Sequence, residues 1–382
     1  MAMTGGQRTG MLAARLVQLS LPIVLLSAAS APSFAESDRY IERVVAREIQ
    51  RMLPSGEPGG AAVAVRTEGR TLFFNYGLAD FAAKRPITSD TLFNLASLRK
   101  VFEATLLAQA VGNGDLSLDD RASKYVTELR QDSDIGRVTL RQLATHTSGL
   151  LLPQDHPPWP HWDYTLPQFI RTLNAWRTDF EVGKPNVYTH AGYILLQLVL
   201  ERRYGMPIDL LIERRITGPL RMTSTTLPRR DDGARGRLSS AYKARAVQGY
   251  GDDGSPIGEP GDQQGYYRWA GTSQMYSSPR DMAIFLAAHL GELSIERSLQ
   301  DAMTLARRGV LAIGPSEQQA LAWEITAGGG PAIVEKYGGL NNASAYIAMI
   351  STRKVGVVIL GNRGNLYPSE PGRRMLLELA AP

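Results

Sequence analysis

Three serines in this chain are each followed three residues later by a lysine, a spacing that suits a serine nucleophile. The pairs are Ser97 with Lys100, Ser240 with Lys243, and Ser351 with Lys354. On a helix, residues three apart share a face, so the lysine amine can take the proton of the serine hydroxyl. Only Ser97 precedes a long apolar stretch, residues 101–111, which predicts that it alone begins a helix. A helix N-terminus also favours developing negative charge, so we expect Ser97 to be the nucleophile.

The elements that must position Ser97 come from both ends of the chain. Helical patterns occur at residues 40–53 and from about residue 373, and Ser278-Pro279 is a clear helix start. Strand-like runs lie at residues 61–65, 71–76, 322–326, 345–350 and 355–360. We therefore predict an α/β (α+β) fold with an antiparallel sheet flanked by helices. The sheet would come from residues 36–95 and 320–382, and residues from about 96 to 319 would form an all-helical lobe.

Composition excludes several classes of function. The chain of 382 residues is 43% hydrophobic and 21% charged, as in ordinary globular proteins. Its net charge of +5 is too small and too dispersed to indicate a nucleic-acid or membrane partner. Without cysteine, the chain has neither a cysteine nucleophile nor a thiolate zinc site. His156 and His161 are separated by Pro-Pro-Trp-Pro, which predicts a loop rather than a helical metal pair, and we expect no metal or cofactor.

The N-terminus has the pattern of a secretory signal peptide. Arg15 precedes the apolar run 16–26, and small residues lead to Ser33-Phe34-Ala35. An apolar core of about 11 residues is too short to span a bilayer. We predict cleavage after Ala35 and a periplasmic protein without a membrane anchor, with residues 36–382 forming one catalytic domain.

Longer stretches give the chain a family resemblance. Residues 73–80, 84–93 and 140–149 resemble the penicillin-recognising serine hydrolases, most closely the class C β-lactamases, and similarity extends from about residue 44 to 379. Ser97 and Lys100 match the Ser-x-x-Lys motif of that family. The resemblance implies that a monomeric enzyme opens small-molecule β-lactam rings through an acyl-enzyme on Ser97. The alternatives are a carboxylesterase or D-alanyl-D-alanine peptidase on the same fold, or a penicillin-binding protein that is acylated without turnover.

The second family motif, Tyr-x-Asn, is altered in this chain. No tyrosine has asparagine two residues later, but Tyr188-Thr-His190 lies ahead of an apolar helical stretch, where the family carries the motif. The resemblance implies that Tyr188 shares the acid–base role with Lys100 and that His190 lines the site in place of asparagine. A core tyrosine and an inward-turned histidine are the plainer interpretations. Nearby lysines should lower the imidazole pKa, so that protonation produces an acid limb in kcat/KM that His190→Asn would remove.

The third motif, Lys-Thr-Gly, corresponds to Lys336-Tyr337-Gly338, followed by Gly339 and a strand from Ser344. The resemblance implies that Lys336 is catalytic and binds the substrate carboxylate, with Tyr337 and Gly338 beside it. The N–H groups of Gly339 and Ser97 would form the oxyanion hole. Trp269-Ala-Gly271 is a rival match that precedes a loop and a helix rather than a strand.

Three further polar residues have weaker assignments. By position, Gln154 and Asn362 match family residues that bind the substrate amide and carboxylate, although ordinary loop polarity explains both equally well. His146 lies in a family helix, and we expect it to be structural rather than catalytic.

Overall fold

The computed structural model describes residues 34–53, 55–152, 165–178, 183, 186–228, 238–261, 275–327, 330–364 and 366–381. Internal contacts divide the chain into residues 1–39 and residues 40–382, and the description below concerns the second unit. Nearly all of the predicted signal peptide lies outside the described residues. Within the described part of the chain, no helix is both long and apolar enough to cross a membrane.

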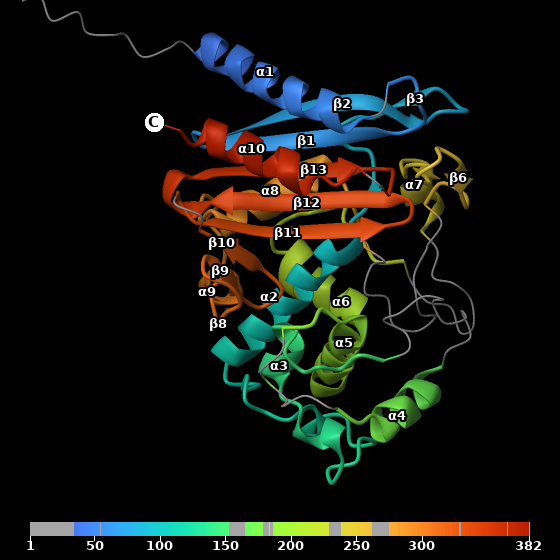
Figure 1. The fold of residues 1–382 in the computed structure, drawn as a ribbon, viewed down its shortest axis with the longest axis vertical. Helices are drawn as coiled ribbons and strands as arrows, with labels where there is room; N and C mark the ends of the chain where they lie inside the picture. Colours follow the sequence, from blue (N-terminus) through green and yellow to red (C-terminus); the bar gives the residue numbers. More distant parts are fainter. Residues whose placement is uncertain are drawn as a thin grey trace, which may run out of the picture. The chain divides into compact units, whose positions relative to one another are not determined.

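A nine-stranded sheet dominates the larger unit (Figure 1). In sheet order its strands are β3 (Arg85–Pro86), β2 (Arg70–Asp80), β1 (Gly60–Thr67), β13 (Val355–Gly361), β12 (Ala343–Ile350), β11 (Ile333–Leu340), β10 (Glu324–Thr326), β9 (Glu317–Gln319) and β8 (Leu311–Ala312). Every ladder of this sheet is antiparallel. β1 pairs with β13, with Val63 opposite Ile359, which confirms that strands from both chain ends share one sheet.

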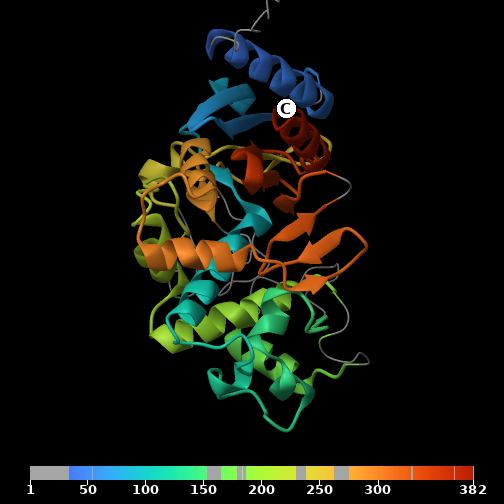
Figure 2. The same cartoon turned by 90° about the vertical axis from the view of Figure 1, so that its left-hand side faces the viewer.

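Alternating side chains give the sheet two apolar faces. One face, with Val63 and Ile359, packs against α1 (Phe34–Met52) and α10 (Ser369–Leu379). The other face, with Ala62 and Val358, packs against the core that contains α8 (Pro279–His289). Figure 2 shows α8 and α10 on opposite sides of the sheet. This period-two pattern buries both faces of β1, β12 and β13, because these central strands lie between two helical layers.

Helices are the main regular elements among the described residues between the N- and C-terminal strands. They are η1 (Ala96–Leu98), α2 (Arg99–Gly112), η2 (Ala122–Lys124), η3 (Asp134–Arg137), α3 (Leu140–Ala144), α4 (Leu166–Ala175), α5 (His190–Tyr204), α6 (Ile208–Ile212), η5 (Glu213–Thr217), α7 (Ser240–Lys243), α8 and α9 (Arg297–Ala306). The prediction of an all-helical lobe was wrong in detail, because β4 (Phe93–Asn94) pairs with β7 (Tyr276–Ser277) and β5 (Gly249–Tyr250) with β6 (Pro256–Ile257). Strands β8 and β9 also extend the main sheet before residue 320.

Local signals set several helix boundaries. The Ser278 side chain accepts a hydrogen bond from the Asp281 N–H, so α8 begins where predicted. The last helix, α10, begins at Ser369, earlier than the predicted residue 373. Helix α2 is buried from Arg99 to Ala110, which explains why apolar residues predominate in its sequence, while the buried Arg99 and Glu103 pair with each other.

His289 on α8 carries a pH-dependent part of the stability. Its ring is fully buried, and neither ring nitrogen has a hydrogen-bond partner among the described residues. Burial, with a smaller effect of Arg307, lowers the pKa of His289 to about 3. The unfolded chain therefore binds a proton below about pH 6.5 that the folded chain does not bind.

We expect acidification to destabilise the protein partly through His289. The lowered pKa removes about 2 kcal/mol of unfolding free energy at pH 5 relative to pH 7. In His289→Leu this contribution is absent. The unfolding free energy measured with urea should therefore fall between pH 7 and pH 5 by about 2 kcal/mol less in this variant than in the parent protein. Equal pH dependence in both proteins would contradict the assignment.

Candidate active site

Ser97 lies on a tight turn between strand β4 and helix α2. It is in η1, directly before α2, and 8% of its surface is exposed. Ala96 has a φ of +48°, and its N–H donates to Asn94 Oδ1 over 2.9 Å. The chain thus turns sharply out of the strand and presents the serine at the start of a buried helix.

The other two Ser-x-x-Lys pairs also lie at helical turns, so the prediction that only Ser97 begins a helix was wrong. Ser240 begins α7, a single turn without a buried residue, and Ser351 begins η6 (Ser351–Arg353), which is likewise unburied. The distinguishing feature of Ser97 is its burial together with Lys100, which is 0% exposed.

Two side chains bind the hydroxyl oxygen of Ser97. Lys100 Nζ donates to Ser97 Oγ over 3.0 Å, and the Tyr188 hydroxyl donates to the same oxygen over 2.7 Å. Lys100 Nζ also lies 5.0 Å from the centroid of the Tyr188 ring. These two groups are placed to exchange a proton with the serine, as general acid–base catalysis requires.

Tyr188 reaches Ser97 from the segment that precedes α5. The Thr189 side chain caps α5 by accepting from the Gly192 N–H over 3.1 Å, which places Tyr188 just outside the helix. Tyr188 is 41% exposed, so one side of its ring faces solvent while the hydroxyl contacts the serine. A substrate can therefore approach the pair from the open side.

Lys336 lies within strand β11, where its Nζ is 5.2 Å from the centroid of the Tyr188 ring. It is 2% exposed and donates to Glu324 Oε1 over 2.8 Å. The strand expected after its motif, from Ser344, is present as β12, but the motif itself also lies in a strand, because β11 contains Lys336, Gly338 and Gly339. The two glycines explain why the sequence did not predict this strand, since glycine is depleted in strands.

Gly338 brings β11 against the serine turn. A Cβ at this position would lie 2.7 Å from the Leu95 carbonyl oxygen and 2.9 Å from the Ser97 nitrogen. Only a residue without a side chain allows this approach. The backbone of β11 therefore passes directly beside the N–H of the candidate nucleophile.

A family model described as Beta-lactamase matches residues 39–381. The chain belongs to the beta-lactamase family. A curated relative, the beta-lactamase of Psychrobacter immobilis, is 28% identical over an alignment of 390 positions that covers 93% of this chain and 91% of that protein. A structure titled beta-lactamase/D-alanine carboxypeptidase, from Pseudomonas syringae, is 26% identical with a TM-score of 0.78, covering 90% of this chain and 100% of that one. A class C beta-lactamase structure is 26% identical with a TM-score of 0.77, covering 90% and 97%.

The β-lactamase fold of this chain does not bring Tyr337 to Ser97. Lys336 and Gly338 face the serine, whereas Tyr337 points to the opposite face and packs with the core beneath α1 and α10. Burial, with a smaller effect of Tyr367, raises the pKa of the Tyr337 phenol. A role of the Tyr337 hydroxyl in binding the substrate carboxylate finds no support in this placement.

Asn362 ties backbone segments together, which contradicts its predicted role in substrate binding. Its side chain is fully buried, and Oδ1 accepts from the Gly60 N–H over 2.7 Å. Its Nδ2 donates to the carbonyls of Gln248 (2.9 Å) and Leu78 (3.1 Å). The amide is therefore occupied by three backbone groups from segments far apart in the chain. Gln154, His156, His161 and the rival match Trp269–Gly271 lie outside the described residues.

His190 begins α5 beside Tyr188. Its ring is edge-on to Tyr188, with the centroids 5.6 Å apart. Burial, followed by the charge of Lys100, lowers the pKa of His190 to about 3. The predicted direction of the shift is confirmed, but burial contributes more than the lysine charge.

The low pKa changes the expected pH profile of activity. His190 is neutral throughout the range from pH 5 to 9, because protonation occurs only near pH 3. We therefore expect kcat/KM of the parent protein and of His190→Asn to have the same shape over that range, although their magnitudes differ. An acid limb above pH 5 that disappears in His190→Asn would show that the ring titrates in the usual range.

Two residues beside the site were not predicted as functional. The sequence placed Glu324 only within a predicted strand. In the structure its carboxylate accepts a hydrogen bond from Lys336 Nζ. His146 was assigned to structure, yet its buried ring lies 4.4 Å from the Tyr188 ring and 5.1 Å from that of Tyr193. The sequence signal for His146 was its place inside residues 140–149, the run that resembles the family.

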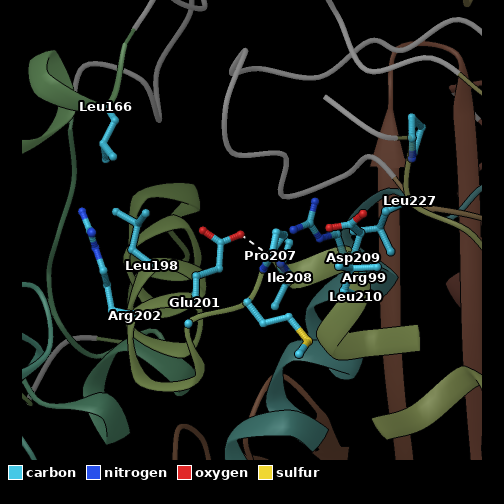
Figure 3. Close-up of a pocket in the computed structure, with 13 residues that line it drawn as sticks. Arg99, Leu166, Leu198, Glu201, Arg202, Pro207, Ile208, Asp209, Leu210 and Leu227 are labelled. Carbon is cyan, nitrogen blue, oxygen red and sulfur yellow. Dashed lines mark hydrogen bonds between the residues drawn. The ribbon is translucent and has the colours of Figure 1, made fainter. Parts of the chain in front are cut away.

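A large cavity of about 850 Å³ lies elsewhere in the lobe, between α5 and α6 (Figure 3). Leu198, Glu201, Met206 and Ile208 line it, and Ser97 does not. Arg99 reaches it from the serine turn, but its guanidinium is already bound to Glu103 Oε1 and Gln197 Oε1, each over 2.8 Å. The chemistry of the site therefore does not lie in this cavity.

Proposed function

We propose that this protein hydrolyses β-lactams through an acyl-enzyme on Ser97. The observation that carries the proposal is the convergence of Lys100 Nζ and the Tyr188 hydroxyl on Ser97 Oγ. A serine is a weak nucleophile unless a neighbouring base accepts its proton, and both candidate bases are within hydrogen-bond reach.

In the acylation step, the Ser97 hydroxyl passes its proton to the oxygen of an ionised Tyr188, and Oγ attacks the lactam carbonyl carbon. The ammonium groups of Lys100 and Lys336, at 5.0 and 5.2 Å from the ring, favour negative charge on that oxygen. When the lactam C–N bond breaks, the departing nitrogen takes the proton back from Tyr188. A water molecule then attacks the ester, and Ser97 is released with its proton restored.

The tetrahedral intermediate needs donors for its oxyanion. The N–H groups of Ser97 and Gly339 are the proposed pair. Support comes from Gly338, whose missing side chain allows β11 to pass beside the Ser97 nitrogen. Lys336 would bind the substrate carboxylate, although Glu324 competes for its ammonium group in the free protein.

A D-alanyl-D-alanine peptidase or carboxylesterase is the second candidate. The structural relative from Pseudomonas syringae is titled both beta-lactamase and D-alanine carboxypeptidase. His190 and Tyr337 replace the asparagine and threonine of the family motifs, which removes two polar groups expected to bind a β-lactam amide and carboxylate. The same serine, lysine and tyrosine would serve either reaction.

The deciding experiment compares nitrocefin with p-nitrophenyl butyrate on one purified protein. We expect steady-state turnover of nitrocefin with a higher kcat/KM than that of the ester. Faster ester hydrolysis would favour the esterase function, and a stoichiometric burst without turnover would indicate a penicillin-binding protein. Failure to react with either substrate would overturn the proposal.

A further inference from the structure

His146 is fixed at the end of α3 by its backbone as well as by its ring. Its φ is +56°, an uncommon value for a residue with a side chain. Residue 146 and its two neighbours hold the segment that carries Tyr188 through three hydrogen bonds. These are Asn186 Nδ2 to the Thr145 carbonyl (3.0 Å), Val187 N–H to the His146 carbonyl (2.8 Å), and Gly183 N–H to the Thr147 carbonyl (2.9 Å).

The ring of His146 also contacts the segment that carries Tyr188. It lies against the Tyr188 ring, with the centroids 4.4 Å apart and the planes inclined by 32°. Its Nδ1 accepts from the Thr189 N–H over 3.4 Å, so the proton of the neutral ring is on Nε2. Nε2 is buried and has no hydrogen-bond partner among the described residues. Such an unsatisfied group is costly, which points to a function for this ring beyond filling the core.

The charges around His146 keep its ring neutral. It faces the ammonium groups of Lys336 and Lys100, the imidazole of His190, and the rings of Tyr188 and Tyr193. Burial first, and then Lys336, Lys100 and His190, hold the pKa of His146 well below 6.5. A protonated ring would add a third positive charge and would lose its Nδ1 acceptor.

We propose that His146 is a positioning residue whose neutral ring holds the Tyr188 hydroxyl against Ser97 Oγ. This proposal rests on the proposed acylation of Ser97, because its effect passes through Tyr188. The ring supplies a flat surface behind the tyrosine, and Nδ1 fixes the next residue along the chain. Loss of either contact lets the phenol turn away from the serine.

A double-mutant cycle tests this coupling. His146→Ala should lower kcat by about 10- to 100-fold, because a displaced catalytic group costs that much, while KM changes by less than about 3-fold. In the Tyr188→Phe background, His146→Ala should cause no further loss, since the hydroxyl that it positions is already absent. His146→Phe, which retains a flat ring but lacks the Nδ1 acceptor, should recover only part of kcat. His289→Ala is the matched control, because His289 is equally buried among aromatic rings but lies on α8.

Additive losses in the two backgrounds, or a His146→Ala protein as active as His289→Ala, would overturn the proposal. If His146→Ala does not fold, His146→Asn replaces it in the cycle, since asparagine tolerates positive φ and retains an acceptor without a ring. The rate of Ser97 labelling by a fluorophosphonate is measured for every variant. This reaction needs an activated serine but no β-lactam, so a protein that labels without hydrolysing nitrocefin would refute the proposed function and leave the His146 cycle measurable.

Discussion

Ser97→Ala is expected to lower nitrocefin turnover by roughly 10⁴-fold or more, because the variant has no oxygen to form the acyl-enzyme. Lys100 Nζ and the Tyr188 hydroxyl both bind the oxygen of the Ser97 hydroxyl. Steady-state assays give the rate, and labelling with a fluorescent penicillin followed by digestion gives the site of the adduct. The adduct should be found on the peptide that contains Ser97.

Ser240→Ala and Ser351→Ala are the matched controls. Each removes the serine of a Ser-x-x-Lys pair at a helical turn, but neither turn has a buried residue. Both variants should retain full turnover and full labelling. An adduct on either serine, or undiminished labelling of Ser97→Ala, would refute the assignment of the nucleophile.

Gly338→Ala is expected to lower kcat/KM by about 100-fold, although it changes no group that takes part in the chemistry. The new Cβ would lie 2.7 Å from the Leu95 carbonyl oxygen and 2.9 Å from the Ser97 nitrogen, so the strand or the serine turn must move. A displacement of about 1 Å at a catalytic group has an effect of this size. Overpacking should also cost about 1–3 kcal/mol of unfolding free energy.

Gly330→Ala provides the control for this substitution. Gly330 precedes β11, and a Cβ there would meet no atom of the described residues within 4 Å. The kcat/KM of the Gly330→Ala protein should equal that of the parent protein within about twofold. If Gly338→Ala were as active as Gly330→Ala, β11 would not need to lie so close to Ser97, and the proposed oxyanion hole would lose its main support.

Local patterns in the sequence were sufficient to locate Ser97, Lys100 and the elements around them. A buried helix is rich in apolar residues, so the mainly apolar stretch after Ser97 was visible without a structure. The hairpin of β1 and β2 and the strands β12 and β13 were equally visible, because alternation and β-branched residues mark buried strands. The resemblance then added Tyr188 and Lys336, which the structure places around Ser97.

Contacts between distant segments were decided only by the tertiary structure. Asn362 has the same local sequence whether it binds substrate or, as here, the Gly60 N–H, since its partners lie far away in the chain. Tyr337 follows Lys336 directly, yet the period-two geometry of β11 turns it to the opposite face of the sheet. The ring of His146 against Tyr188, and the carboxylate of Glu324 on Lys336, likewise required the folded chain. Hydrophobic periodicity records which face of an element is buried, whereas the partner of a polar side chain depends on how those elements pack.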